Sequence, residues 1–216
     1  MCGLFNGILI AKLRLPDFIV TLGTMSIFRG AALIYTDGKP IYGVDKVFRS
    51  IFAGQLYGIA TPVLFALVIA VLAYLLIRFT TLGEQIVAVG GNEEAARLSG
   101  IDVDRVKIGV YAMSGVLSSI AGFILVARIG AAEPIGGNGF ELQAIGAAVI
   151  GGASLFGGRG HPKNALFGGL VIALLANGMG LLGLSAGIQD LFTGLILLLA
   201  VTIDALSRRR LAAAGR

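Results

Sequence analysis

The chain has 216 residues, of which 56% are hydrophobic and 13% are charged, and its mean hydropathy is +0.91. An average soluble domain carries about 25% charged residues, so this chain cannot cover a water-facing surface in the usual way. Its formal net charge is +5. Its one cysteine, Cys2, excludes an internal disulfide, and its one histidine, His161, excludes a multi-histidine zinc site. The composition predicts an all-α, polytopic integral membrane protein, and it excludes soluble enzymes and proteins that bind nucleic acid.

The first apolar segment, Met1–Ala11, is too short to cross a membrane, because a spanning helix needs about 20 apolar residues. It has no basic region before it and no small-residue cleavage site after it, so it does not read as a signal peptide. We interpret it as the end of a helix whose beginning is missing. We therefore expect the chain to be truncated at its N-terminus.

Six longer stretches with few charges follow, and we expect each to form a spanning helix. They are 18–36, 60–79, 107–128, 142–158, 165–183 and 190–207. Pro62 lies in the first turn of the second stretch, where proline is tolerated. The break from Gly183 to Gly187 separates the last two stretches. The whole chain, 1–216, is thus expected to be one transmembrane domain that is incomplete at its N-terminus.

The distribution of basic residues predicts the orientation of these stretches. Arg208, Arg209 and Arg210 follow the last stretch, and basic residues flanking a span favour the cytoplasmic side. The C-terminus is therefore expected in the cytoplasm. Counting spans backwards places Arg159 and Arg97 in the cytoplasm, and Lys46 and Glu133 outside.

The expected cytoplasmic loop, 80–106, contains a pattern typical of a short helix. Asn92 is a favoured N-cap, Glu93 and Glu94 complement the dipole of the first turn, and Gly100 suits a left-handed C′ position. The residues between these ends are Ala95, Ala96, Arg97, Leu98 and Ser99. Since such a short helix is marginal in water, it is either a solvated connector or a docking helix for a cytoplasmic partner. Asp102 or Asp104 can cap the span that follows.

Catalytic and cofactor motifs are absent from the sequence. No glycine-rich run contains the Gly-Lys-Ser/Thr of a phosphate loop, so any nucleotide hydrolysis must lie on another chain. No metal site and no cofactor are predicted.

Polar residues inside the spans are candidates for lining a solute pathway, although hydrogen bonding between helices is their commoner use. They are Thr21, Thr24, Arg29, Ser114, Ser118 and Asn177. The glycine-dense segment from Gly146 to Gly183 favours close helix packing.

Four runs of residues are similar to the ribose/xylose-type permease family of bacterial ABC sugar importers. They are 12–25, 90–101, 151–160 and 196–204, and the resemblance covers essentially the whole chain. It implies the transmembrane subunit of an ATP-driven monosaccharide importer in the bacterial inner (plasma) membrane. The implied partners are a cytoplasmic ABC ATPase, a second permease subunit in a homodimer, and an extracytoplasmic sugar-binding protein. The implied fold resembles the C-terminal part of the vitamin B12-importer-type permease.

The resemblance also implies a role for the segment Asn92–Gly100 as the helix that couples the permease to its ATPase. Glu94-Ala95-Ala96 followed by Gly100 is similar to the Glu-Ala-Ala loop of importer permeases, although the Leu-Pro ending of that motif is missing. Because Ala95 and Ala96 are small, we expect a groove on the ATPase to approach both closely. Two other functions stay open, a branched-chain amino-acid importer permease and an ion-coupled carrier. Carriers need intramembrane carboxylates, and the sequence shows no pair of them.

Overall fold

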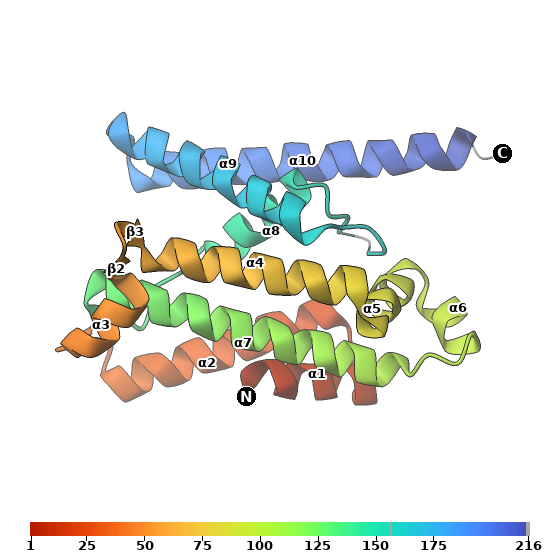
Figure 1. Ribbon diagram of the computed structural model, residues 1–216, viewed down its shortest axis with the longest axis horizontal. Helices are drawn as coiled ribbons and strands as arrows, with labels where there is room; N and C mark the ends of the chain where they lie inside the picture. The colour runs from red at the N-terminus through yellow and green to blue at the C-terminus, as the bar shows by residue number, and fades with distance from the viewer. Residues whose placement is uncertain (156, 215–216) are drawn as a thin grey trace. The chain divides into compact units, whose positions relative to one another are not determined.

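The computed structural model of the protein describes residues 1–155 and 157–214, and the side chains of all of these except 186, 203–204 and 206–214 (Figure 1). The side chains of Arg208, Arg209 and Arg210, on which the orientation depends, therefore lie outside the described residues, as does Phe156. The chain forms two compact units. The first comprises Met1–Ile69 and Glu94–Asn138, and the second Ala70–Glu93 and Gly139–Arg216.

The first unit is organised around α7 (Val103–Ile129), its longest helix. Helix α1 (Cys2–Leu13) packs against both α7 and α2 (Asp17–Thr36) (Figure 1). Glycines permit this close approach: a Cβ built on Gly7 would lie 2.9 Å from the Cα of Ile108, and one built on Gly3 would lie 2.9 Å from the Cα of Gly115. Two glycines one turn apart on α1 therefore let the two helix backbones meet.

The loops at the C-terminal end of α7 are held together by strands and aromatic side chains. Strand β1 (Ile41–Tyr42) pairs antiparallel with β4 (Ala131–Ala132), and β2 (Gln55–Leu56) pairs with β3 (Ile59–Ala60). Helix α3 (Lys46–Ala53) places Phe48 and Phe52 against Phe123 of α7, with ring centroids 5.9 and 5.5 Å apart. The loops 37–60 and 130–139 therefore meet at one end of α7.

The second unit contains most of α4 (Thr61–Phe79), and also α5 (Thr81–Gly91), α8 (Phe140–Ile150), α9 (Pro162–Leu181) and α10 (Ala186–Ala214). Helix α8 packs against α9 and α10. A Cβ on Gly168 of α9 would collide with the backbone carbonyl of Ala147 in α8, and one on Gly151 would collide with the carbonyl of Asn164. These contacts confirm the packing interpretation for these two glycines.

Four helices, α2, α4, α7 and α9, are long and apolar enough to cross a membrane. They overlap the stretches expected at 18–36, 60–79, 107–128 and 165–183, and α10 overlaps the one expected at 190–207. Helix α4 has no buried residue, so its apolar side chains need lipid or another apolar surface around them. The protein is therefore a helical, multi-pass membrane protein.

The stretch expected at 142–158 differs from the structure, because α8 ends at Ile150. Gly152 has a left-handed φ of +81°, and the N–H groups of Gly152 and Ala153 donate to the carbonyls of Val149 and Ala148 at 2.8 and 2.9 Å. This pattern closes a helix end. An 11-residue helix is about 16 Å long, shorter than the hydrocarbon core. The apolar composition of 142–158 did not reveal this stop.

Candidate functional site

The short helix expected in the loop 80–106 is present as α6 (Glu93–Leu98). Asn92 directly precedes it with an extended backbone, as an N-cap position requires. At its other end Gly100 has a φ of +84°, and the N–H groups of Gly100 and Ile101 donate to the carbonyls of Arg97 and Ala96, each at 3.1 Å. These two hydrogen bonds form the turn that a left-handed glycine makes after a helix, so the prediction for Gly100 is confirmed.

The exposure of α6 corrects one prediction about its partner-facing side. Ala96 is only 5% exposed, whereas Leu98 is 85% exposed, and Glu94 and Ala95 are exposed as well. Ala96 packs inside the protein and cannot meet a groove of another protein. Neighbouring residues point about 100° apart on any α-helix, but the sequence does not show which of the two alanines faces the rest of the protein. The exposed side of α6 is formed by Glu94, Ala95 and Leu98.

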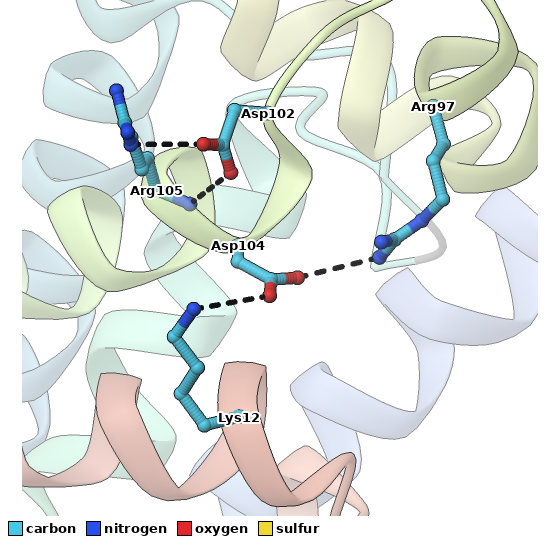
Figure 2. A network of polar contacts seen from close by, with 5 residues as sticks. All are labelled: Lys12, Arg97, Asp102, Asp104 and Arg105. Atoms are coloured by element: carbon cyan, nitrogen blue, oxygen red, sulfur yellow. Dashed lines mark hydrogen bonds and ion pairs between the residues drawn. The ribbon is translucent and has the colours of Figure 1, made fainter.

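A set of ion pairs surrounds the start of α7, next to α6 (Figure 2). Of the two expected caps the structure uses Asp102, whose carboxylate accepts from the Arg105 N–H at 3.1 Å and pairs with the Arg105 guanidinium at 2.8 Å. Asp104 accepts from the Arg97 guanidinium at 3.3 Å and pairs with the Lys12 ammonium at 3.5 Å. The carboxylate of Asp104 thus contacts cations from α1 and α6.

A backbone contact connects the end of α5 to the glycine-rich loop between α8 and α9. A Cβ on Gly158 would lie 2.7 Å from the Cα of Gly91, and one on Gly90 would lie 2.9 Å from the Gly158 nitrogen. A Cβ on Gly157 would collide with the Gly90 carbonyl. The residues just before α6 are therefore packed against the loop 151–160, and two of the runs that carry the family resemblance contact each other.

The polar residues expected in a solute pathway lie on three different helices. On α2, Thr24 is buried and its hydroxyl donates to the Val20 carbonyl at 2.9 Å, while the Thr21 hydroxyl donates to the Asp17 carbonyl at 2.9 Å. Arg29 is half-buried on α2. Ser114 and Ser118 are exposed one turn apart on α7, and Asn177 is exposed on α9 in the second unit. Their role in a pathway stays a prediction.

Sequence reasoning missed Lys12 and Asp104 as members of the site. Lys12 lies in the last turn of α1, and Asp104 lies in the first turn of α7, 92 residues further along the chain. No spacing pattern joins residues so far apart. Within the part of the chain that the structure describes, no group of three His, Cys, Asp or Glu side chains could hold a metal ion.

Comparisons with known proteins identify relatives over nearly the whole chain. It is 44% identical over 201 residues to the ribose import permease protein RbsC of Bacillus subtilis (strain 168). The aligned region covers 92% of this chain and 62% of that protein. It is 41% identical over 206 residues to RbsC of Escherichia coli (strain K12), with 94% of this chain and 64% of that protein aligned. It is also 41% identical over 199 residues to the L-arabinose transport system permease protein AraH of Escherichia coli (strain K12), with 92% of this chain and 61% of that protein aligned.

The chain thus spans less than two thirds of the length of these relatives. No solved structure matches it. Residues 1–201 match the model of the family described as "Branched-chain amino acid transport system / permease component". These relatives are permeases, which agrees with the prediction of a transporter subunit and not an enzyme. The resemblance to ribose-type permeases is confirmed, and the chain belongs to this family of transport-system permease components.

Proposed function

We propose that the chain is the transmembrane subunit of an ATP-driven ABC importer and helps to form the pathway for a monosaccharide of the ribose/xylose class. The observation that carries the proposal is the identity of 41–44% to permeases named for ribose and L-arabinose, over more than nine tenths of this chain. The apolar helices α2, α4, α7 and α9 supply the membrane part. ATP hydrolysis is assigned to a separate chain, because no phosphate-loop sequence is present here.

The proposal assigns α6 as the helix that docks on the ATPase. A six-residue helix is not stable without tertiary contacts, and α6 has them on one side through buried Ala96. Its C-terminal turn at Gly100 fixes the helix end. The other side presents Ala95 and Leu98 to the surroundings as a small apolar patch next to the carboxylate of Glu94. This exposed side is the proposed contact surface for the ATPase.

The proposed orientation places the start of α7 in the cytoplasm and its end outside. The cations Lys12, Arg97 and Arg105 gather at the start of α7, as expected for the cytoplasmic side. Pairing of β1 with β4 supports a common, external side for the loops that carry Lys46 and Glu133. The contact of Gly158 with Gly91, just before α6, supports the same cytoplasmic side for the loop 151–160. With α9 and α10 taken as spans, the chain then returns to the cytoplasm at its C-terminus.

Cysteine labelling tests this orientation. Cys2 is exposed, so the background variant is Cys2→Ser. An impermeant maleimide added to intact cells should label Lys46→Cys and Glu133→Cys, and should label Arg159→Cys only after the membrane is opened. Labelling of Arg159→Cys in intact cells would contradict the orientation.

The assembly that we propose contains a second permease subunit, in a homodimer, together with an ATPase and an extracytoplasmic sugar-binding protein. The exposed apolar surfaces of α4 and α9 support contacts with lipid and with a further permease subunit. The same proposal gives the chain the C-terminal part of the vitamin B12-importer-type permease fold.

Uptake by the native cell tests the substrate class. Deletion of the gene should abolish uptake of radiolabelled ribose or xylose and should leave leucine uptake unchanged. The family description makes a branched-chain amino-acid importer the alternative. If deletion abolishes leucine uptake and spares pentose uptake, the alternative is correct and the proposed substrate class is wrong.

A further inference from the structure

One carboxylate, that of Asp104, joins three separate helices of the first unit. It lies in the first turn of α7, pairs with Arg97 of α6 at 3.3 Å and pairs with Lys12 of α1 at 3.5 Å (Figure 2). Figure 2 shows the side chains of Lys12 and Arg97 reaching Asp104 from two different helices. Asp104 is therefore the shared acceptor of two cations that are 85 residues apart in the sequence.

The neighbouring pair, Asp102 with Arg105, provides a contrast within the same turn. Its two residues belong to the cap and first turn of α7, so it joins α7 only to itself. Its side chains are 52% and 88% exposed, whereas those of Asp104, Arg97 and Lys12 are 27%, 48% and 62% exposed. Ion pairs in full contact with water contribute little, and shielding strengthens them. Asp104 is the better placed of the two carboxylates to hold separate elements together.

The elements that Asp104 joins lie on a continuous route from the cytoplasmic loop into the membrane. Helix α6 ends in the turn at Gly100, and Asp102 then caps α7, a helix of 27 residues. Helix α1 packs along α7 through Gly3 and Gly7. A displacement of α6 therefore reaches α7 through the chain, and it reaches α1 through Asp104.

We propose that Asp104 is a positioning residue that makes α6, α7 and α1 move as one body when the ATPase displaces α6. This inference rests on the proposed function, because it takes α6 as the docking helix. Asp104 touches neither substrate nor ATPase in this role. Its removal should leave the ATPase bound, and should reduce the sugar transported for each ATP hydrolysed.

The test uses the complete transporter, with its ATPase and binding protein, reconstituted in proteoliposomes. Asp104→Asn removes the charge and keeps the shape of the side chain, and Arg97→Gln removes one partner from an exposed helix. Asp102→Asn is the matched control, since asparagine still caps α7. The measured quantities are ATPase co-purification, ATP hydrolysis and sugar uptake. We expect Asp104→Asn and Arg97→Gln to lower uptake per ATP at least fivefold, with co-purification within twofold of the unmodified protein and with Asp102→Asn unchanged.

A variant with all three charges of the Asp104 network reversed distinguishes a positioning role of Asp104 from a defect in folding. Lys12→Glu, Arg97→Glu and Asp104→Lys together restore the attraction with opposite signs, and should recover most of the uptake per ATP that Asp104→Lys alone loses. The inference is overturned if Asp104→Asn keeps normal uptake per ATP, or if the triple variant recovers nothing. Leu98→Arg identifies a failure of the proposed function instead: if that variant retains the ATPase at the normal level, α6 is not the docking helix.

Discussion

The contact between α8 and α9 gives the sharpest test of the packing, because two adjacent glycines on α9 should respond in opposite directions. A Cβ on Gly168 would overlap the Ala147 carbonyl and lie 2.8 Å from the Gly151 nitrogen, both of them backbone atoms. A Cβ on Gly169 meets nothing within 4 Å. Both residues lie inside α9, so helix propensity favours alanine equally at the two positions.

The magnitudes follow from these surroundings. Replacing an interior helical glycine by alanine stabilises by roughly 0.5–1 kcal/mol when nothing obstructs the methyl group, as at Gly169. At Gly168 the methyl group forces α8 and α9 apart, and overpacking costs about 1–3 kcal/mol. At roughly 2–4 °C for each kcal/mol in a chain of this size, Gly168→Ala should lower the melting temperature by several degrees.

The assay is a thermal melt of the detergent-solubilised protein, with a C-terminal fluorescent fusion followed by gel filtration. We expect Gly169→Ala to melt at or slightly above the temperature of the unmodified protein, and Gly168→Ala to melt clearly below it. Equal melting temperatures for the two variants would refute the backbone contact between α8 and α9.

Three further substitutions test the region around α6. Gly100→Val forces a β-branched residue to a φ of +84°, at a cost of roughly 1–2 kcal/mol, and should reduce ATPase co-purification without loss of protein from the membrane; normal co-purification would contradict the turn. Asp102→Ala removes the cap of α7 and should cost about 0.5–2 kcal/mol, measured as a lower melting temperature, which Asp102→Asn should largely restore. Leu98→Arg should abolish ATPase association, whereas Val47→Arg, at another exposed aliphatic position, on α3, should have no effect; equal results for both would count against docking through α6.

The helices of this protein could be predicted from the sequence wherever apolar length and polar ends coincide. Helices α2, α4, α7 and α9 lie where long stretches with few charges are bounded by charges or by Pro and Gly. The turn at Gly100 could be predicted because only glycine adopts that backbone conformation without strain. Local chemistry determines these features, so the local sequence reveals them.

Features that depend on tertiary contacts were not visible in the sequence. The burial of Ala96 but not of Ala95 depends on which side of α6 meets the rest of the protein. The pairing of Lys12 with Asp104 joins distant segments, and its two residues carry no signal of each other. One local feature was missed as well: the early end of α8 arises from the turn at Gly152, which average hydropathy over 142–158 conceals.

Photo-crosslinking from α6 asks directly whether this helix docks on the ATPase. A crosslinking amino acid is introduced at Leu98, in the native cell, with the same substitution at Val47 of α3 as the control; both side chains are exposed. We expect position 98 to crosslink to a cytoplasmic ABC ATPase and position 47 not to do so. Capture of the ATPase from position 47, or its absence from the products at position 98, would contradict the assignment of α6 as the docking helix.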